Sequence, residues 1–111
     1  MKLKNNEINV IYNTLMSIGD KQSDIGLRFD LVKKIEPLRK QVDLIKESTD
    51  KLIAVKHEED ENVTSISVYD TGYMDLMNYE NEFDFDGLTL GYLAKFNPST
   101  LQLSAIEKII K

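Results

Sequence analysis

Apolar residues at helical spacing open the chain and predict its first element. They recur every three or four positions between residues 8 and 18, which is the period of one face of an α-helix. We therefore expect a short helix over residues 6 to 18. Asn5 or Asn6 should cap it, because a short side-chain acceptor reaches the free N–H groups of a first turn. Gly19 is placed to end the helix in the left-handed conformation.

The longest apolar pattern is a heptad-like seam between residues 31 and 52. Its apolar members are Leu31, Ile35, Leu38, Val42, Ile45 and Leu52. The pattern predicts a long charged helix over residues 27 to 58, which would measure about 48 Å at 1.5 Å per residue. A globule of about 100 residues has a radius of gyration of only about 13 Å. We therefore expect this helix to protrude or to pack along a partner, and we expect the seam to support self-association.

Pro37 interrupts this pattern. Proline lacks an N–H, and its ring crowds the carbonyl four residues earlier, which here belongs to Lys33. Either the helix kinks at this point, or Pro37 opens a second helix. We favour the kink, because the apolar phase is kept across the proline.

Two stretches of alternating residues, 63 to 69 and 80 to 86, are typical of short strands and are expected to pair with each other. In the second stretch Phe83 and Phe85 share the face expected to be buried. Glu82, Asp84 and Asp86 occupy the opposite face. A short helix is expected between the stretches.

A final helix is expected near the end of the sequence. Asn97 should cap it, with Pro98 in the first helical position. Its apolar face contains Ile106, Ile109 and Ile110.

These elements predict a mainly α fold with a small β element, in the α+β class. The expected order is a short N-terminal helix, a long kinked charged helix, a two-stranded β element and a C-terminal helix. The 111 residues suit a single domain, 1–111, from which the long helix can protrude. The sequence contains no cysteine, no apolar run long enough to span a membrane and no signal-peptide pattern at its start. We therefore expect a soluble protein with no membrane partner.

The charges divide the chain into two unlike halves. Residues 1 to 56 contain 11 Lys or Arg and 8 Asp or Glu, whereas residues 57 to 111 contain 3 and 11. No Lys or Arg occurs between His57 and Ala94, a range that holds ten carboxylates. Such a surface should repel nucleic acid and attract a basic surface. That basic surface belongs either to another protein or to the basic half of a second copy.

The run from Glu82 through Asp84 and Asp86 to Gly87 partly matches a calcium-binding loop, which also needs a bidentate Glu at its twelfth position. Leu93 stands there and cannot ligate a metal ion. We therefore interpret the carboxylates as the solvent-facing side of a strand, available to a basic protein, and expect no metal site.

Asp70, Thr71 and Gly72 match the half-site of dimeric aspartic proteases, in which two carboxylates share a proton. That chemistry belongs to an almost entirely β chain, so a turn with Asp70 or Thr71 as a helix cap is the expected structure. His57, the single histidine, is expected at a solvated helix end. We expect no catalytic residue, no cofactor and no enzymatic activity.

Four segments together resemble a group of small bacteriophage proteins whose role is not settled. They are KLKNNEINVIYNTL, IGLRFDLVKKIEPLRKQ, YMDLMNYENEFDFDGLTL and LSAIEKII. The resemblance covers most of the chain and implies a phage or prophage origin among late or accessory genes. It implies no catalytic residue.

The leading hypothesis is a phage accessory protein that acts through protein–protein contacts in virion assembly, in the host cytoplasm or with the virion. Its expected partners are itself, as a homo-oligomer, and another phage or host protein. The expected contact residues are the apolar seam between 31 and 52 and the carboxylates Glu82, Asp84 and Asp86. The alternative is an inhibitor of a host defence or nucleic-acid-handling protein, with the acidic run imitating phosphate charge. A small hydrolase, resting only on Asp70, is a distant third.

Overall fold

The computed structural model describes residues 1–111, and its first helix, α1 (Asn5–Asp20), confirms the prediction of a helix at the start of the chain. Tyr12, one of the five side chains that predicted it, is half-buried against the core, and the other four face inward and are at most 2% exposed. They are Ile8, Ile11, Leu15 and Ile18. Burying four such side chains contributes far more to stability than any local propensity.

Both predicted ends of α1 were wrong. The cap position is Lys4, and Asn5 lies in the first turn with only 3% of its surface exposed. Gly19 lies inside the helix and has no positive φ. A Cβ on Gly19 would come within 3.0 Å of Leu31 Cδ2, so close packing against the next helix favours glycine there.

The predicted long helix consists of two helices, α2 (Ile25–Lys34) and α3 (Glu36–Glu59), which meet at Ile35. The favoured prediction of a kink was therefore wrong: Pro37 lies in the first turn of α3 and opens a second helix. The physical reason is that a first turn needs no N–H donor at that position. Asp24 caps α2 by accepting a hydrogen bond from the N–H of Leu27 at 3.0 Å.

The β element is a two-stranded antiparallel sheet, but its strands are not the predicted pair. β1 (Lys2–Lys4) pairs with β2 (Glu80–Glu82), with Leu3 opposite Asn81. Residues 63 to 69 form an irregular loop instead, with a bend at Ser65 and a turn at Val68 and Tyr69. None of these residues is buried, so the alternating pattern does not give a strand with one face in the core. In β1, by contrast, Leu3 is only 1% exposed and packs into the core. Residues 83 to 86 continue beyond β2 without a ladder partner.

Four further elements complete the chain: α4 (Thr71–Asn78), α5 (Leu90–Ala94), α6 (Thr100–Ala105) and the 3₁₀ turn η1 (Glu107–Ile109). The predicted cap of the last helix was wrong, because Ser99 caps α6 and accepts the N–H of Gln102. Asn97 instead adopts the left-handed conformation, with φ of 51°, and turns the chain between α5 and α6. The short asparagine side chain tolerates that conformation.

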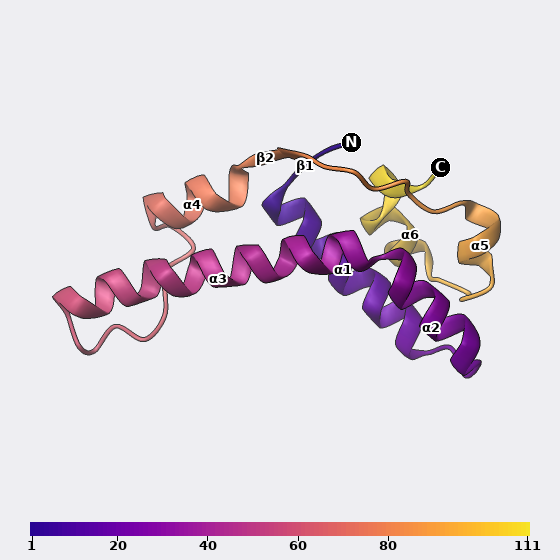
Figure 1. The fold of residues 1–111 in the computed structure, drawn as a ribbon, viewed down its shortest axis with the longest axis horizontal. Helices are drawn as coiled ribbons and strands as arrows, with labels where there is room; N and C mark the ends of the chain where they lie inside the picture. The colour runs from indigo at the N-terminus through magenta and orange to yellow at the C-terminus, as the bar shows by residue number, and fades with distance from the viewer.

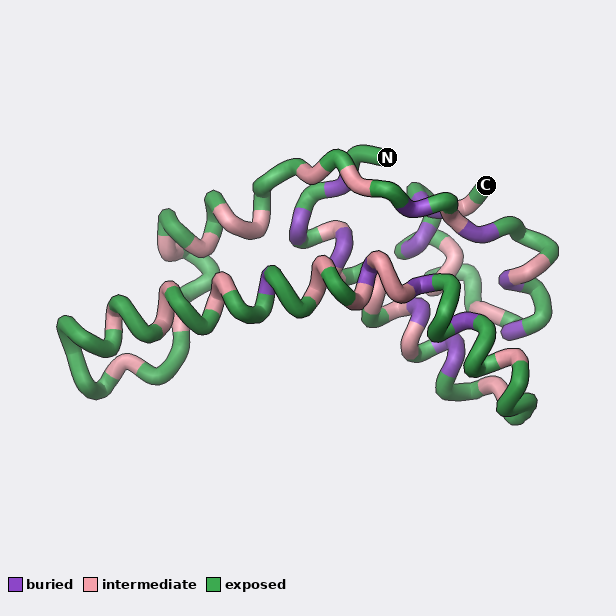
Figure 2. The backbone as a smooth tube through the Cα atoms, viewed as in Figure 1, coloured by how far each residue is buried: buried purple, intermediate pink, exposed green.

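The core surrounds α1 at one end of the molecule, and the rest forms an arm. Figure 1 shows α3 running out from the core, with α4 lying along its outer half. No residue between Ile45 and Phe85 is buried, as the lack of purple along this part of the tube shows (Figure 2). The molecule therefore measures 50 × 27 × 23 Å. We define the arm as residues 48–78 and the arm end as residues 55–70.

Candidate interaction surface

Four consecutive carboxylates crowd the arm end where α3 terminates. Glu58, Glu59, Asp60 and Glu61 are all exposed. The C-terminus of a helix carries a partial negative charge, so acidic residues there are locally unfavourable. Lys56 and His57 lie in the last turn of α3, but none of the four carboxylates forms an ion pair within the chain.

The arm end is held in shape by a small set of contacts. Lys56 forms an ion pair with Asp70 at 2.7 Å, and His57 Nδ1 lies 2.9 Å from the carbonyl oxygen of Val63. Asp70 also accepts the N–H of Tyr73 and so caps α4, as predicted. The Lys56 ammonium, followed by this N–H, holds the pKa of the Asp70 carboxyl below its usual range. Asp70 thus acts as a structural residue of the arm.

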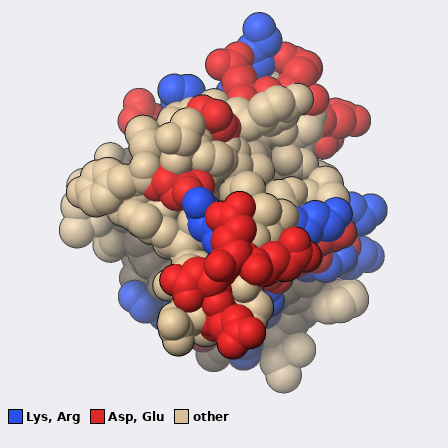
Figure 3. Space-filling view, turned by 90° about the vertical axis from the view of Figure 1, so that its left-hand side faces the viewer, with Lys and Arg blue, Asp and Glu red and all other residues tan.

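Apolar side chains accompany the carboxylates at the arm end. Val55 and Val68 are exposed, and 84% of Tyr69 faces solvent. In the space-filling view of this end of the molecule, Asp and Glu side chains gather over its centre (Figure 3). The arm end therefore combines uncovered apolar groups with concentrated negative charge, the composition expected of a docking surface for a basic partner.

The apolar seam packs largely within the chain. Leu31, Ile35, Leu38 and Ile45 are buried in the core cluster. Val42 is half-buried against the same core, and Leu52 is half-buried under the start of α4, 3.3 Å from the site of a Cβ on Gly72. The buried members stabilise this chain. Self-association through the whole seam stays a prediction.

Residues 82 to 86, at the end of β2 and just beyond it, are exposed or buried largely as predicted. Glu82, Asp84 and Asp86 are exposed. Phe85 is buried, at 7% exposure, whereas Phe83 is half-buried against it with ring centroids 6.4 Å apart. The prediction that both rings are core residues is therefore confirmed for Phe85 alone.

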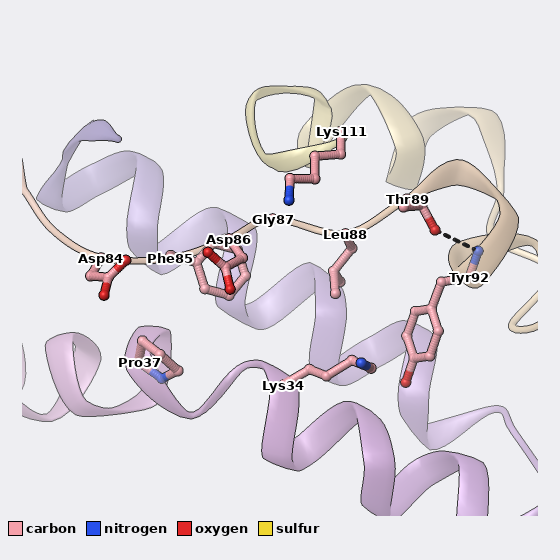
Figure 4. Close-up of a pocket in the computed structure, with 10 residues that line it drawn as sticks. All are labelled: Lys34, Pro37, Asp84, Phe85, Asp86, Gly87, Leu88, Thr89, Tyr92 and Lys111. Carbon is pink, nitrogen blue, oxygen red and sulfur yellow. Dashed lines mark hydrogen bonds between the residues drawn. The ribbon is translucent and has the colours of Figure 1, made fainter.

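Asp84 and Asp86 line an open cleft of about 480 Å³ between this stretch and the start of α3 (Figure 4). Lys34 and Lys111 line the same cleft, so two cations balance the two carboxylates. The Lys34 ammonium lies 5.1 Å from the ring centroid of Tyr92, close enough for a cation–π contact. The chain contains no group of three or more His, Asp or Glu side chains placed to hold a metal ion.

Tyr92 connects this cleft to α2. Its hydroxyl donates a hydrogen bond of 2.6 Å to Asp30 Oδ2. Burial, together with this carboxylate, raises the pKa of the Tyr92 hydroxyl well above its usual range. The tyrosine therefore stays protonated and serves as a fixed donor that ties α5 to α2.

Sequence reasoning missed an apolar stripe on the outer face of α2. Its members are Ile25, Phe29 and Val32, all exposed. Their spacing of four and three residues is a helical face in its own right, but the apolar seam that begins at Leu31 occupies a different face of the same helix. The Lys33 ammonium lies 5.7 Å from the ring centroid of Phe29.

A second missed feature is a polar network at the base of the arm. The Asn5 amide donates to the carbonyl of Leu76 at 2.7 Å and accepts from Asn81 at 2.8 Å. Gln41 donates to the side-chain oxygen of Asn81 at 3.1 Å. These bonds join α1, α3, α4 and β2, so the network holds the arm at a defined angle to the core.

Comparison with protein-family models, with curated proteins and with solved structures found no match for the chain. None of its helices combines the length and the apolar character that crossing a bilayer requires.

Proposed function

We propose that this chain is a small phage-encoded protein without enzymatic activity that acts through protein–protein contacts as an accessory to virion assembly. The docking surface is the arm end, which binds a basic partner protein in the host cytoplasm or on the assembling virion. The observation that carries the proposal is the row of carboxylates from Glu58 to Glu61, placed at a helix C-terminus where they are locally unfavourable.

The shape of the molecule supports this role. The arm extends the charged surface away from the core, so a partner can reach it from several sides (Figure 1). Electrostatic attraction acts over a Debye length of about 8 Å at physiological salt. A concentrated patch therefore accelerates encounters with a basic surface more than scattered charges would. Phage origin rests on the resemblance of the segments described in the sequence.

The alternative is inhibition of a host protein that handles nucleic acid. The observation that favours it is the absence of Lys and Arg between residues 57 and 94, so that the ten carboxylates of this range carry charge of one sign, of the kind a DNA-binding groove attracts. In this case the chain would act early in infection and would be dispensable for particle formation.

A complementation experiment tests the proposal. A phage deleted for this gene is supplied with the wild-type chain, with Glu58→Lys/Glu59→Lys, or with the control Asp50→Lys/Glu107→Lys. Asp50 and Glu107 are exposed carboxylates outside the arm end, so the control has the same change of net charge. Wild type and control should restore particle yield, and the arm-end variant should not.

Two results would count against the proposal. Full complementation by the arm-end variant would remove the arm end as the docking surface. A deletion phage that forms normal numbers of particles, but grows poorly only in hosts carrying a particular defence protein, would favour inhibition. Circular dichroism of the purified variants verifies that each remains folded.

A further inference from the structure

We propose that copies of this chain associate head to tail, with the α2 stripe of one copy seated on the arm end of the next. The α2 stripe is the set Ile25, Phe29 and Val32. This inference rests on the proposed role of the arm end as a docking surface, and it names one partner, a second copy of the chain.

The α2 stripe is an apolar surface over which only the Lys33 ammonium lies, 5.7 Å from the ring centroid of Phe29. Ile25 is 76% exposed and Phe29 is 64% exposed, although both belong to a regular helix. The opposite face of α2 supplies the packing of this helix, because Leu31 is buried and Leu27 packs against the core. Removing the stripe would therefore not weaken the core, which leaves association as the reason for its apolar character.

Basic groups flank the stripe and match the charge of the arm end. Arg28 and Lys33 lie on either side of the stripe on the helix, and Lys21 precedes it. Arg28 has only a long, exposed ion pair with Asp20, at 3.9 Å, so its guanidinium can pair with another carboxylate. The arm end has the complementary composition: exposed Val55, Val68 and Tyr69 beside the four carboxylates.

Charge decides between two ways of covering the stripe. If α2 packed on α2 of a second copy about a two-fold axis, the flanking Arg28 and Lys33 of both copies would approach one another and repel. Packing on the arm end instead places apolar groups on apolar groups and cations beside carboxylates. The head-to-tail contact is therefore favoured over the two-fold one.

The two surfaces lie at opposite ends of the molecule, whose long axis measures 50 Å (Figure 1). One copy cannot bring its own stripe to its own arm end. Each contact between copies leaves one stripe and one arm end unoccupied, so association continues into a ring or an open filament.

Sedimentation velocity of purified variants tests this contact at low ionic strength and high micromolar concentration. Phe29→Asp places a charge in the middle of the α2 stripe. Glu58→Lys/Glu59→Lys reverses the charge of two of the four carboxylates of the arm end. Wild type should sediment as a concentration-dependent series of oligomers, and each variant alone as a monomer. A mixture of the two variants should form dimers and nothing larger, because each variant keeps one intact surface. Ionic strength of about 1 M, where the screening length falls to about 3 Å, should shift wild type toward monomer.

The control Asp50→Lys/Glu107→Lys should assemble as wild type does. Phe29 is exposed, so Phe29→Asp does not disturb the core, and Ile25→Asp provides a second variant of the stripe. A monomeric wild type, a mixture that stays monomeric, or assembly by Phe29→Asp alone would each overturn the inference.

The two proposals fail separately. A monomeric wild type combined with loss of complementation by the arm-end variant would leave the proposed function standing, with a different partner. Full complementation by an arm-end variant that no longer assembles would remove the proposed function and leave the contact between copies.

Discussion

Replacement of Gly87 by alanine should destabilise the protein strongly, although Gly87 is only half-buried. Gly87 has φ of 77°, a conformation that costs a residue with a Cβ about 1–2 kcal/mol. The new Cβ would also lie 2.5 Å from the carbonyl oxygen of Ile109, which is backbone and cannot rotate away.

That carbonyl is part of the connection between this segment and the last residues of the chain. It accepts the N–H of Leu88 at 2.9 Å, and the N–H of Lys111 donates to the carbonyl of Leu88 at 2.8 Å. Moving Ile109 weakens or breaks both bonds, at about 0.5–1.5 kcal/mol each. Together with the backbone term, Gly87→Ala should lower the free energy of unfolding by about 2–5 kcal/mol.

Urea unfolding followed by far-UV circular dichroism measures this loss, and Gly91→Ala is the matched control. Gly91 lies in α5 with nothing within 4 Å of its would-be Cβ, so alanine should stabilise the protein by about 0.5–1 kcal/mol. Neutral surface substitutions change the free energy of unfolding by up to about 0.5 kcal/mol. A change no larger than that for Gly87→Ala would contradict the positive φ of Gly87 and its close approach to Ile109.

Four further substitutions test the core, the polar network and the arm. Phe85→Ala should cost about 3–5 kcal/mol in the same urea assay because its ring is buried, whereas exposed Asp84→Asn should change stability by less than about 0.5 kcal/mol; equal effects would contradict the burial. Asn5→Ala should cost about 1–3 kcal/mol, since Asn81 and the Leu76 carbonyl lose their partner, and an unchanged midpoint would argue against the network. Asp70→Asn should be less stable than wild type at pH 7. The lowered pKa of Asp70 means that its contribution is present above the usual value of about 4 and is lost as the pH falls through the folded value. The difference should therefore vanish in strong acid, and one that persists there would refute the ion pair with Lys56.

The sequence predicted the elements that have a regular buried face. Ile8 through Ile18 all point at one core, so their period identified α1 directly. The N-terminal end of α1 was not predictable in the same way. The Asn5 side chain does not cap its own turn but donates a hydrogen bond to the carbonyl of Leu76, 71 positions later. β1 is only three residues long, too short for any alternation to be recognised.

The acidic charge of the arm end was predictable from the sequence, whereas the α2 stripe was not. The uneven division of acidic and basic residues along the sequence is enough to identify the arm end as acidic. The α2 stripe was hidden because the heptad seam accounts for the same segment of sequence with a different face. Only the break at Ile35 and the burial of Leu31 show which face of α2 turns inward.

The pairing of β1 with β2 makes the start of the chain depend on residues synthesised much later. Leu3 accepts a hydrogen bond from Asn81, 78 positions away. At about 5–20 residues per second, a ribosome needs roughly 4–15 s to cover that distance. During this interval α1 can already pack on α2 and α3, but Leu3 and Asn5 stay unprotected. A nascent chain stalled in the loop between α3 and α4 would therefore expose the apolar Leu3 and the unpaired Asn5 to chaperones and proteases. Slow codons in that stretch should lower the yield of folded protein.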